Sequence, residues 1–248
     1  MYDIFLKDIT LIKNGRKILD DINAHFPKGK TTVVIGPSGC GKSTLLKVAA
    51  SLIPVDYGKI FVNDKNLRKM HSPELLEFRK NSSFVFQDAA LWANQTVYQN
   101  MSLPLRLHFP EMGKKLQDDK IMDMLDLVGY SDSINLIPAA LSNGERKMVS
   151  LARALITSPG LIYLDNPLVL VDPSVAKRMT KLILDLHNTE ATIVANFSSP
   201  LLVNKMADYL YVMKSGKLVE TGIKESVFNS KNSITTNIID SLLKHESN

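Results

Sequence analysis

The sequence predicts an α/β protein with a mainly parallel sheet and helices on both faces. Short strands of the buried type, at residues 161–164, 192–195 and 209–213, follow one another in the C-terminal half, and an amphipathic helix at 175–187 separates the first two. A β-branched run at 31–35 leads into a glycine-rich turn and a helical segment. The chain has 248 residues, of which 45% are hydrophobic, so it can bury a substantial core.

The N-terminal elements have a different character. Residues 3–12 and 17–26 are typical of two strands, and Asn14-Gly15 between them is a hairpin signal. We therefore expect an N-terminal antiparallel β subdomain. A helix should begin at Lys42 and end near residue 52.

The middle of the chain contains more helix than strand. Two short strands are predicted at 59–62 and 84–86, and Ser72 is placed to cap a helix that begins with proline. Helices are expected at 73–80, 115–128 and 144–156. The stretch from about 72 to 157 thus predicts an inserted helical subdomain within a single domain of about 1–230. The tail at 231–248 is weakly amphipathic and predicts a short peripheral helix.

Composition excludes several classes of protein. The longest apolar stretch, 151–171, is interrupted by two prolines, a glycine, an arginine and an aspartate, so no transmembrane helix is expected. The N-terminus lacks the pattern of a secretory signal. A single cysteine, Cys40, excludes an intramolecular disulfide and a cysteine-based zinc site. These three observations lead us to expect a soluble, cytoplasmic protein. The net charge of +5 comes from scattered basic residues, so no nucleic-acid partner is expected.

One motif predicts a phosphate-binding loop. It satisfies the pattern G-x-x-x-x-G-K-[ST] between a strand and a helix, and it consists of Gly36, Pro37, Ser38, Gly39, Cys40, Gly41, Lys42 and Ser43, with Thr44 following. Lys42 is expected to contact the β- and γ-phosphates of a nucleotide, and the Ser43 hydroxyl is expected to be a magnesium ligand. A second magnesium ligand is expected in Asp165, because four apolar residues of a buried strand precede it. The fold class is therefore an α/β P-loop NTPase core.

Three further motifs occur in a fixed order. Gln87 follows a strand, Leu141-Ser142-Asn143-Gly144-Glu145 opens a helix, and Val171-Asp172-Pro173 follows the strand of Asp165. With the phosphate loop, this set resembles the ATP-binding subunit of ABC transporters over about residues 3–225. These motifs are similar to that family's Q-loop, LSGGQ signature and D-loop.

The resemblance implies a function. Two such domains would pair head to tail around two ATP molecules, with Ser142 and Gly144 of one chain contacting the γ-phosphate held by the other. Gln87 would contact the magnesium ion and the attacking water. An integral membrane permease would hold the subunit at the inner membrane, on its cytoplasmic side. The segment after Gln87 is similar to that of importer-type and phospholipid-trafficking ATPases, including the group that works with an MCE-type lipid-binding protein. Leu91 and Trp92 are candidates for the permease groove or, equally, for subdomain core.

Several positions depart from the family pattern. Asn166 stands where the family has the glutamate that acts on water, and Asn196 stands where it has the switch histidine. An amide cannot accept the proton, and losing a general base costs about 10²–10⁴ in rate. Asp88 and Asp172 are the nearest candidate substitutes. Lys13 occupies the place of the aromatic residue that stacks on adenine.

The signature also differs, since it reads Ser-Asn-Gly-Glu. Asn143 tolerates left-handed backbone angles, and Arg146 is a candidate to offset the charge of Glu145. Two interpretations therefore stay open at this point. The chain is an ABC-type ATPase that powers transport, or it is a degenerate subunit that binds ATP as a conformational clamp beside a competent ABC partner.

Overall fold

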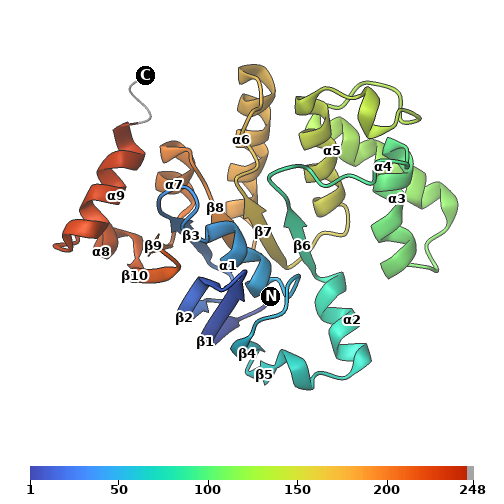
Figure 1. The fold of residues 1–248 in the computed structure, drawn as a ribbon. Helices are drawn as coiled ribbons and strands as arrows, with labels where there is room; N and C mark the ends of the chain where they lie inside the picture. Colours follow the sequence, from blue (N-terminus) through green and yellow to red (C-terminus); the bar gives the residue numbers. More distant parts are fainter. Residues whose placement is uncertain (245–248) are drawn as a thin grey trace.

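Helix α1 (Lys42–Ala49) lies between two β-sheets in the computed structural model, which describes residues 1–244 (Figure 1). Its buried residues include Leu45 and Leu46, and they share one core with side chains from both sheets. Ile4 and Leu6 come from the smaller sheet, and Tyr163 comes from the larger one. The helix that follows the phosphate loop is therefore held on two sides, which fixes the start of the helix in space.

The smaller sheet is antiparallel and has the strand order β2-β1-β4-β5. At the tip of its first hairpin, Asn14 and Gly15 both have positive φ, as a type I′ turn requires. This agrees with the N-terminal antiparallel β-sheet expected from the sequence. Its strands are β1 (Ile4–Lys13), β2 (Arg16–Phe26), β4 (Tyr57–Val62) and β5 (Lys65–Asn66).

The larger sheet has the order β10-β9-β3-β8-β7-β6, and only β10 runs antiparallel to its neighbour. The strand before the phosphate loop, β3, is central, and all five of its residues are buried. A strand covered on both faces reads as a continuous apolar or β-branched run, which is why the sequence identified it. The strands are β3 (Thr31–Ile35), β6 (Ser82–Val85), β7 (Leu161–Asp165), β8 (Thr192–Asn196), β9 (Tyr209–Lys214) and β10 (Lys217–Ile223).

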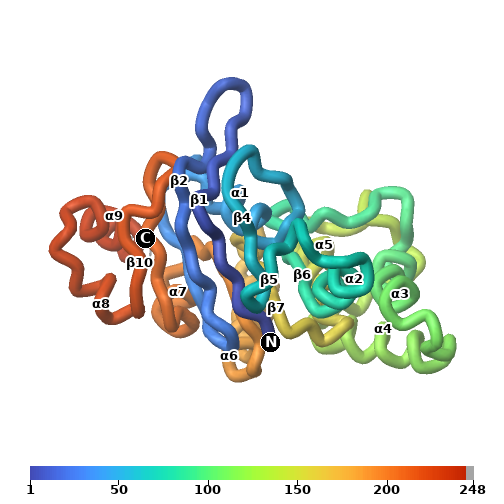
Figure 2. The backbone as a smooth tube through the Cα atoms, turned by 90° about the horizontal axis from the view of Figure 1, so that it is seen from below, coloured from blue at the N-terminus to red at the C-terminus, as the bar shows by residue number. Residues whose placement is uncertain are grey.

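Three helices form a group beside the β6 edge of this sheet (Figures 1 and 2). They are α3 (Val97–His108), α4 (Lys114–Val128) and α5 (Asn143–Leu155). Helix α2 (Ser72–Lys80) contacts β6 and lies below this group in Figure 1. The remaining helices are α6 (Pro173–His187), α7 (Pro200–Met206), α8 (Lys224–Phe228) and α9 (Ser233–Lys244).

Several element boundaries differ from the sequence expectation. Helix α1 ends at Ala49 rather than near residue 52, because Ser51 adopts positive φ. The N-cap of α2 is His71 rather than Ser72. Strand β6 begins at Ser82, two residues earlier than expected. Helices α3, α7 and α8 and strands β5 and β10 were not expected. In α3 the internal Pro104 hid the pattern, since proline disfavours helix interiors.

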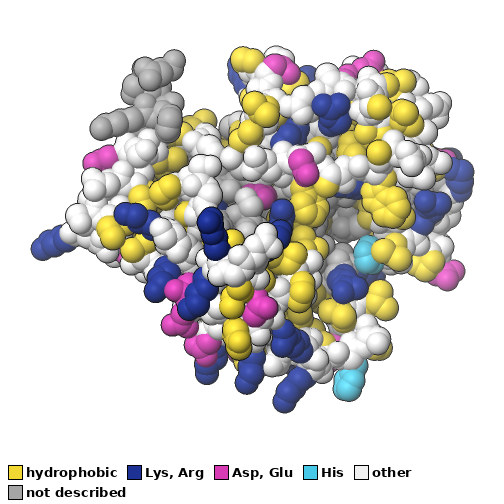
Figure 3. All heavy atoms as spheres, viewed as in Figure 1, with side chains coloured by type: hydrophobic (Ala, Val, Ile, Leu, Met, Phe, Trp, Pro, Cys, Tyr) yellow, Lys and Arg dark blue, Asp and Glu magenta, His cyan; other side chains and the backbone are white. Residues whose placement is uncertain are grey.

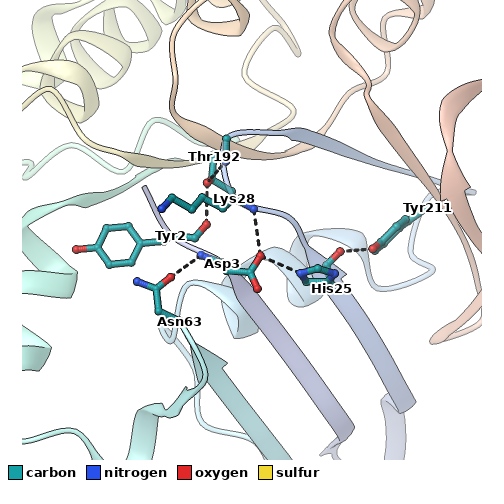
Figure 4. Close-up of polar contacts among 8 residues, drawn as sticks. Tyr2, Asp3, His25, Lys28, Asn63, Thr192 and Tyr211 are labelled. Atoms are coloured by element: carbon teal, nitrogen blue, oxygen red, sulfur yellow. Dashed lines mark hydrogen bonds and ion pairs between the residues drawn. The ribbon is translucent and has the colours of Figure 1, made fainter.

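A polar cluster joins the two sheets at the end opposite the phosphate loop (Figure 4). The Asp3 carboxylate accepts hydrogen bonds from His25 Nε2 at 2.8 Å and from the Lys28 amide at 3.1 Å. The Thr192 hydroxyl, at the start of β8, donates to the Tyr2 carbonyl at 2.7 Å. The Tyr211 hydroxyl donates to the His25 carbonyl. The Thr192 and Tyr211 bonds hold the smaller sheet against β8 and β9.

The surface carries charges of both signs. On the face drawn in Figure 3, Lys and Arg side chains are interspersed with Asp, Glu and hydrophobic ones. Within residues 1–244, no helix is both long enough and apolar enough to span a membrane.

Candidate functional site

The phosphate loop wraps closely between β3 and α1. Gly36 has φ 154°, and a Cβ there would lie 2.1 Å from the Met213 carbonyl oxygen. Gly41 has φ 109°, and a Cβ there would lie 2.9 Å from the Ile18 carbonyl oxygen. Both positions therefore require glycine. The first turn of α1 has no side-chain cap, so its amides remain available to an anion.

Lys42 and Ser43 lie where the loop becomes helix. Lys42 Nζ donates to the carbonyl oxygens of Gly36 at 2.7 Å and Pro37 at 2.8 Å. These bonds keep the ammonium group folded over the loop. The Ser43 hydroxyl donates to Asp165 Oδ1 at 2.7 Å, although the two residues are 122 positions apart.

Asp165 is the centre of a buried polar network. It ends β7, and the parallel register pairs it with Asn196 at the end of β8. Asp165 is 2% exposed and Asn196 is 3% exposed. Asn196 Nδ2 donates to Asp165 Oδ1 at 3.0 Å, so this one oxygen accepts from both Asn196 and Ser43. The Ser43 hydroxyl and the Asp165 carboxylate are hard oxygen donors of the kind that Mg²⁺ prefers.

No cluster of three or more His, Cys, Asp or Glu side chains that could hold a metal occurs within residues 1–244. Magnesium usually keeps several waters and binds through one or two protein groups plus substrate phosphates. The pair Ser43 and Asp165 fits that pattern.

The Asn166 side chain is hydrogen-bonded to Ser198 and has no group that can act as a general base. Its side-chain Nδ2 donates to the Ser198 hydroxyl at 2.8 Å, and its Oδ1 accepts from the Ser198 amide at 3.3 Å. Its backbone amide donates to the Asn196 carbonyl at 2.8 Å, and its φ is 45°. The amide side chain thus ties two strand ends together at the position where the family pattern has glutamate.

The two carboxylates considered as substitute bases do not line the cavity above the phosphate loop. Asp172 caps α6: it accepts from the Ser174 hydroxyl at 2.7 Å and from the Val175 amide at 3.2 Å. These hydrogen bonds hold the pKa of Asp172 below its ordinary value. Asp88 is exposed beside Gln87. Within this single chain, neither is placed to take a proton from water at the phosphate loop.

The signature segment starts α5 through a capping box. The Ser142 hydroxyl accepts from the Glu145 amide at 3.2 Å, and the Glu145 carboxylate accepts from the Ser142 amide at 2.6 Å. Glu145 therefore stabilises the helix start. Arg146 donates to the Leu141 carbonyl at 2.8 Å and, among the described residues, does not pair with Glu145. The charge offset expected of Arg146 therefore does not take the form of an ion pair within residues 1–244, and it stays a prediction.

Gly144 and Asn143 pack against the segment that follows Asp165. A Cβ on Gly144 would lie 3.1 Å from Asp172 Oδ2, and Asn143 Nδ2 donates to the Leu170 carbonyl. Ser142 and Gly144 do not line the cavity above their own phosphate loop. Their predicted contact with a nucleotide needs a second chain and stays a prediction.

Three polar side chains of α5 hold the segment after Gln87. Lys147 Nζ donates to the Gln87 carbonyl, and the Ser150 hydroxyl donates to the Ala89 carbonyl at 2.7 Å. The Arg153 guanidinium donates to the carbonyls of Ala89 at 3.3 Å and Ala90 at 3.0 Å. Lys147 is only 3% exposed, and burial lowers its pKa.

These α5 contacts explain an unusual backbone. Ala89 and Ala90 both have positive φ, at 66° and 46°, a costly conformation for residues with a Cβ. Sequence analysis missed the three polar side chains, but a signal was present: they recur every third residue along one side of the helix, between apolar residues.

Leu91 and Trp92 lie next along the chain. Leu91 is half-buried against the larger core, whereas Trp92 is 60% exposed. The structure thus gives Leu91 a packing role and leaves Trp92 at the surface.

A cavity of about 650 Å³ opens above the phosphate loop. Most of the predicted site residues line it: Gly36, Pro37, Ser38, Gly39, Gly41, Lys42, Ser43, Thr44, Gln87, Asn166 and Asn196. Cys40 is buried beneath the loop, and burial raises the pKa of its thiol. Lys13 is not among the lining residues, so the place expected for adenine stacking does not face the cavity.

One wall of this cavity was not expected from the sequence. It belongs to α9, whose lining residues are Ile234, Asn237, Ile238, Ser241 and Leu242. Ile18, Phe197, Ser198 and Lys214 complete the surroundings. The peripheral helix expected in the tail is therefore part of the cavity.

Comparison with known proteins gives the same assignment from independent information. Residues 19–169 match the model of the ABC transporter family. The chain is 32% identical over 224 residues to the intermembrane phospholipid transport system ATP-binding protein MlaF of Escherichia coli (strain K12), which covers 90% of this chain and 82% of that protein. It is 34% identical over 211 residues to the methionine import ATP-binding protein MetN of Rhodopseudomonas palustris (strain BisA53), covering 85% of this chain and 56% of MetN.

Solved structures share the fold. The dimeric structure of MJ0796, a bacterial ABC transporter cassette, aligns with a TM-score of 0.80 and 25% identity, covering 89% of this chain and 98% of that one. A post-hydrolysis dimer of the same cassette, bound to ADP and phosphate, aligns with a TM-score of 0.79 and 24% identity. With the strand–loop–helix phosphate site on the central strand, these matches place the chain in the ABC transporter family, as an ATP-binding subunit.

Proposed function

We propose that this subunit binds MgATP on the phosphate loop, pairs head to tail with a second ABC domain, and energises transport through a membrane permease. The observation that carries the proposal is the Ser43–Asp165–Asn196 network beside the Lys42 ammonium. It provides a cation for phosphate and two oxygen ligands for Mg²⁺, and two of these residues, Lys42 and Ser43, line a cavity large enough for a nucleotide.

The degenerate clamp is the second candidate, and Asn166 favours it. Both polar atoms of that side chain are hydrogen-bonded to Ser198, and within residues 1–244 no carboxylate side chain lines the cavity. ATP would then bind and hold the dimer closed while hydrolysis stays slow. A competent ABC partner would supply the missing glutamate.

Steady-state MgATP hydrolysis by the purified protein separates the two candidates. We expect ATP binding with turnover lower than general-base catalysis provides, by about 10²–10⁴. Lys42→Ala supplies the background, because it removes the cation that pairs with phosphate. Turnover far above this background would refute the clamp, and equal ATP affinity in Lys42→Ala and the wild type would refute the phosphate-loop assignment.

A gain-of-function variant tests the role of position 166. Asn166→Glu restores a carboxylate there, and we expect turnover to rise above that of the wild type. The matched control is Asn166→Gln, which has the same length but cannot accept a proton. An equal rise in both variants would show that release from Ser198, rather than base chemistry, limits the rate.

The transported substrate is proposed from similarity. The relative MlaF is named for intermembrane phospholipid transport and MetN for methionine import. The wider coverage of MlaF favours a phospholipid system with an MCE-type lipid-binding protein. Purification of the complex from membranes, followed by lipid extraction, tests this: a permease with bound phospholipid supports it, and a permease with a periplasmic amino-acid receptor contradicts it.

A further inference from the structure

We propose that helix α9 forms the nucleoside-binding wall of the cavity, so that the base and ribose of the nucleotide pack against Ile234, Ile238 and Leu242. This inference rests on the proposed binding of MgATP at the phosphate loop. It names the part of the chain that recognises the portion of the ligand beyond the phosphates, and it assigns that task to the C-terminal helix.

The helix is fixed in position by its own buried contacts. The Thr235 hydroxyl, which is fully buried, donates to Glu220 Oε2 at 2.6 Å. The Ser230 hydroxyl donates to the same oxygen at 2.6 Å. Ile239, on the same side of the helix as Thr235, is 5% exposed and belongs to the larger core. A wall anchored in this way can bind a ligand without a large ordering cost.

The face turned to the cavity suits a nucleoside better than phosphate. Ile234, Ile238 and Leu242 recur every four residues and are half-buried, which gives an apolar stripe along one side of the helix. Asn237 and Ser241 flank this stripe with hydrogen-bonding groups and without charge. A planar base buries apolar area against aliphatic side chains, and its edge needs donors and acceptors.

The other walls of the cavity offer no group suited to stack on the base. Lys42 and the start of α1 are placed to bind the phosphates. Lys13 does not face the cavity, and Phe197, the one aromatic residue lining it within residues 1–244, is buried at 3% exposure. The described chain therefore offers no exposed aromatic platform here. Ile18, on β2, is an aliphatic group on the side of the loop.

The experiment compares MgATP with magnesium tripolyphosphate, which has phosphates and no nucleoside. Calorimetric titration is made with the full-length wild type, Ile238→Ala and Asn237→Ala. We expect Ile238→Ala to weaken MgATP binding roughly tenfold and to leave tripolyphosphate binding unchanged. Leu243→Ala is the matched control, because Leu243 lies on α9 and does not line the cavity.

Asn237 is exposed, so Asn237→Ala should fold even if a change at Ile238 disturbs packing. A selective loss of MgATP affinity in Asn237→Ala then supports the proposal by itself. Unchanged MgATP affinity in both variants, equal loss for both ligands, or tighter MgATP binding would each overturn it. Wild-type protein that binds tripolyphosphate and MgATP equally would also overturn it, because the nucleoside then adds nothing. Wild-type protein that binds neither ligand would refute the proposed function instead.

Discussion

Replacing Asn196 by leucine should destabilise the protein by breaking the network around Asp165. Leucine has a similar shape but cannot donate, so Asp165 Oδ1 would lose the bond from Asn196 Nδ2 at 3.0 Å and keep only the one from Ser43. Both Asp165 and Asn196 are nearly inaccessible, so water cannot replace the lost donor. Hydrogen bonds to charged groups contribute about 1.5–3 kcal/mol. For a chain of this size, a loss of about 2 kcal/mol lowers the melting temperature by about 4–8 °C.

Urea unfolding without nucleotide, monitored by circular dichroism, measures the effect. We expect a lower midpoint concentration of urea and an unchanged dependence of the unfolding free energy on urea concentration. Asn204→Leu is the matched control: Asn204 is exposed on α7, so its midpoint should move little. If Asn196→Leu unfolds at the wild-type urea concentration, the buried hydrogen bond does not stabilise Asp165, and the network loses its stated role.

Three other substitutions test separate contacts. Tyr163→Phe removes the buried hydroxyl that donates to the Ala49 carbonyl at 2.9 Å, and it should lower the free energy of unfolding by about 1 kcal/mol, measured in urea. The pKa of Asp172 is lowered by hydrogen bonds from Ser174 and the α6 start, so its contribution to stability is present above the ordinary carboxyl pKa of about 3.9 and is lost as pH falls through the lower folded value. The free energy of unfolding of Asp172→Asn should therefore be lower than that of the wild type at neutral pH, and the two values should converge in acid. A difference in unfolding free energy that does not change with pH would contradict this. Arg153→Met should release the segment after Gln87, seen as faster amide exchange there, whereas unchanged exchange would show that the other α5 contacts suffice.

The sequence was most informative where local chemistry and backbone geometry coincide. The phosphate loop needs glycine at Gly36 and Gly41 because a side chain would collide with backbone, and those requirements are visible as a motif. The buried strands before Asp165 and Asn196 were visible as apolar runs, and the parallel register then brought the two residues together.

Other features depend on contacts between distant segments. Helix α3 was missed because Pro104 argues against a helix, although Thr96 and Gln99 form a capping box at its start. The position of α9 over the cavity depends on Thr235 reaching Glu220 on β10, a strand that was itself missed. A periodic pattern can indicate that a helix exists, but it does not give the neighbour against which the helix packs.

Helix α5 has a mechanical consequence. Its start carries Ser142 and Gly144. Its later turns hold the segment after Gln87 through hydrogen bonds from Lys147, Ser150 and Arg153. Thirteen residues of helix make a rod about 20 Å long. A displacement of that segment is therefore transmitted to the signature as a movement of the whole helix. The two ends of α5 move together because the helix is continuous between them.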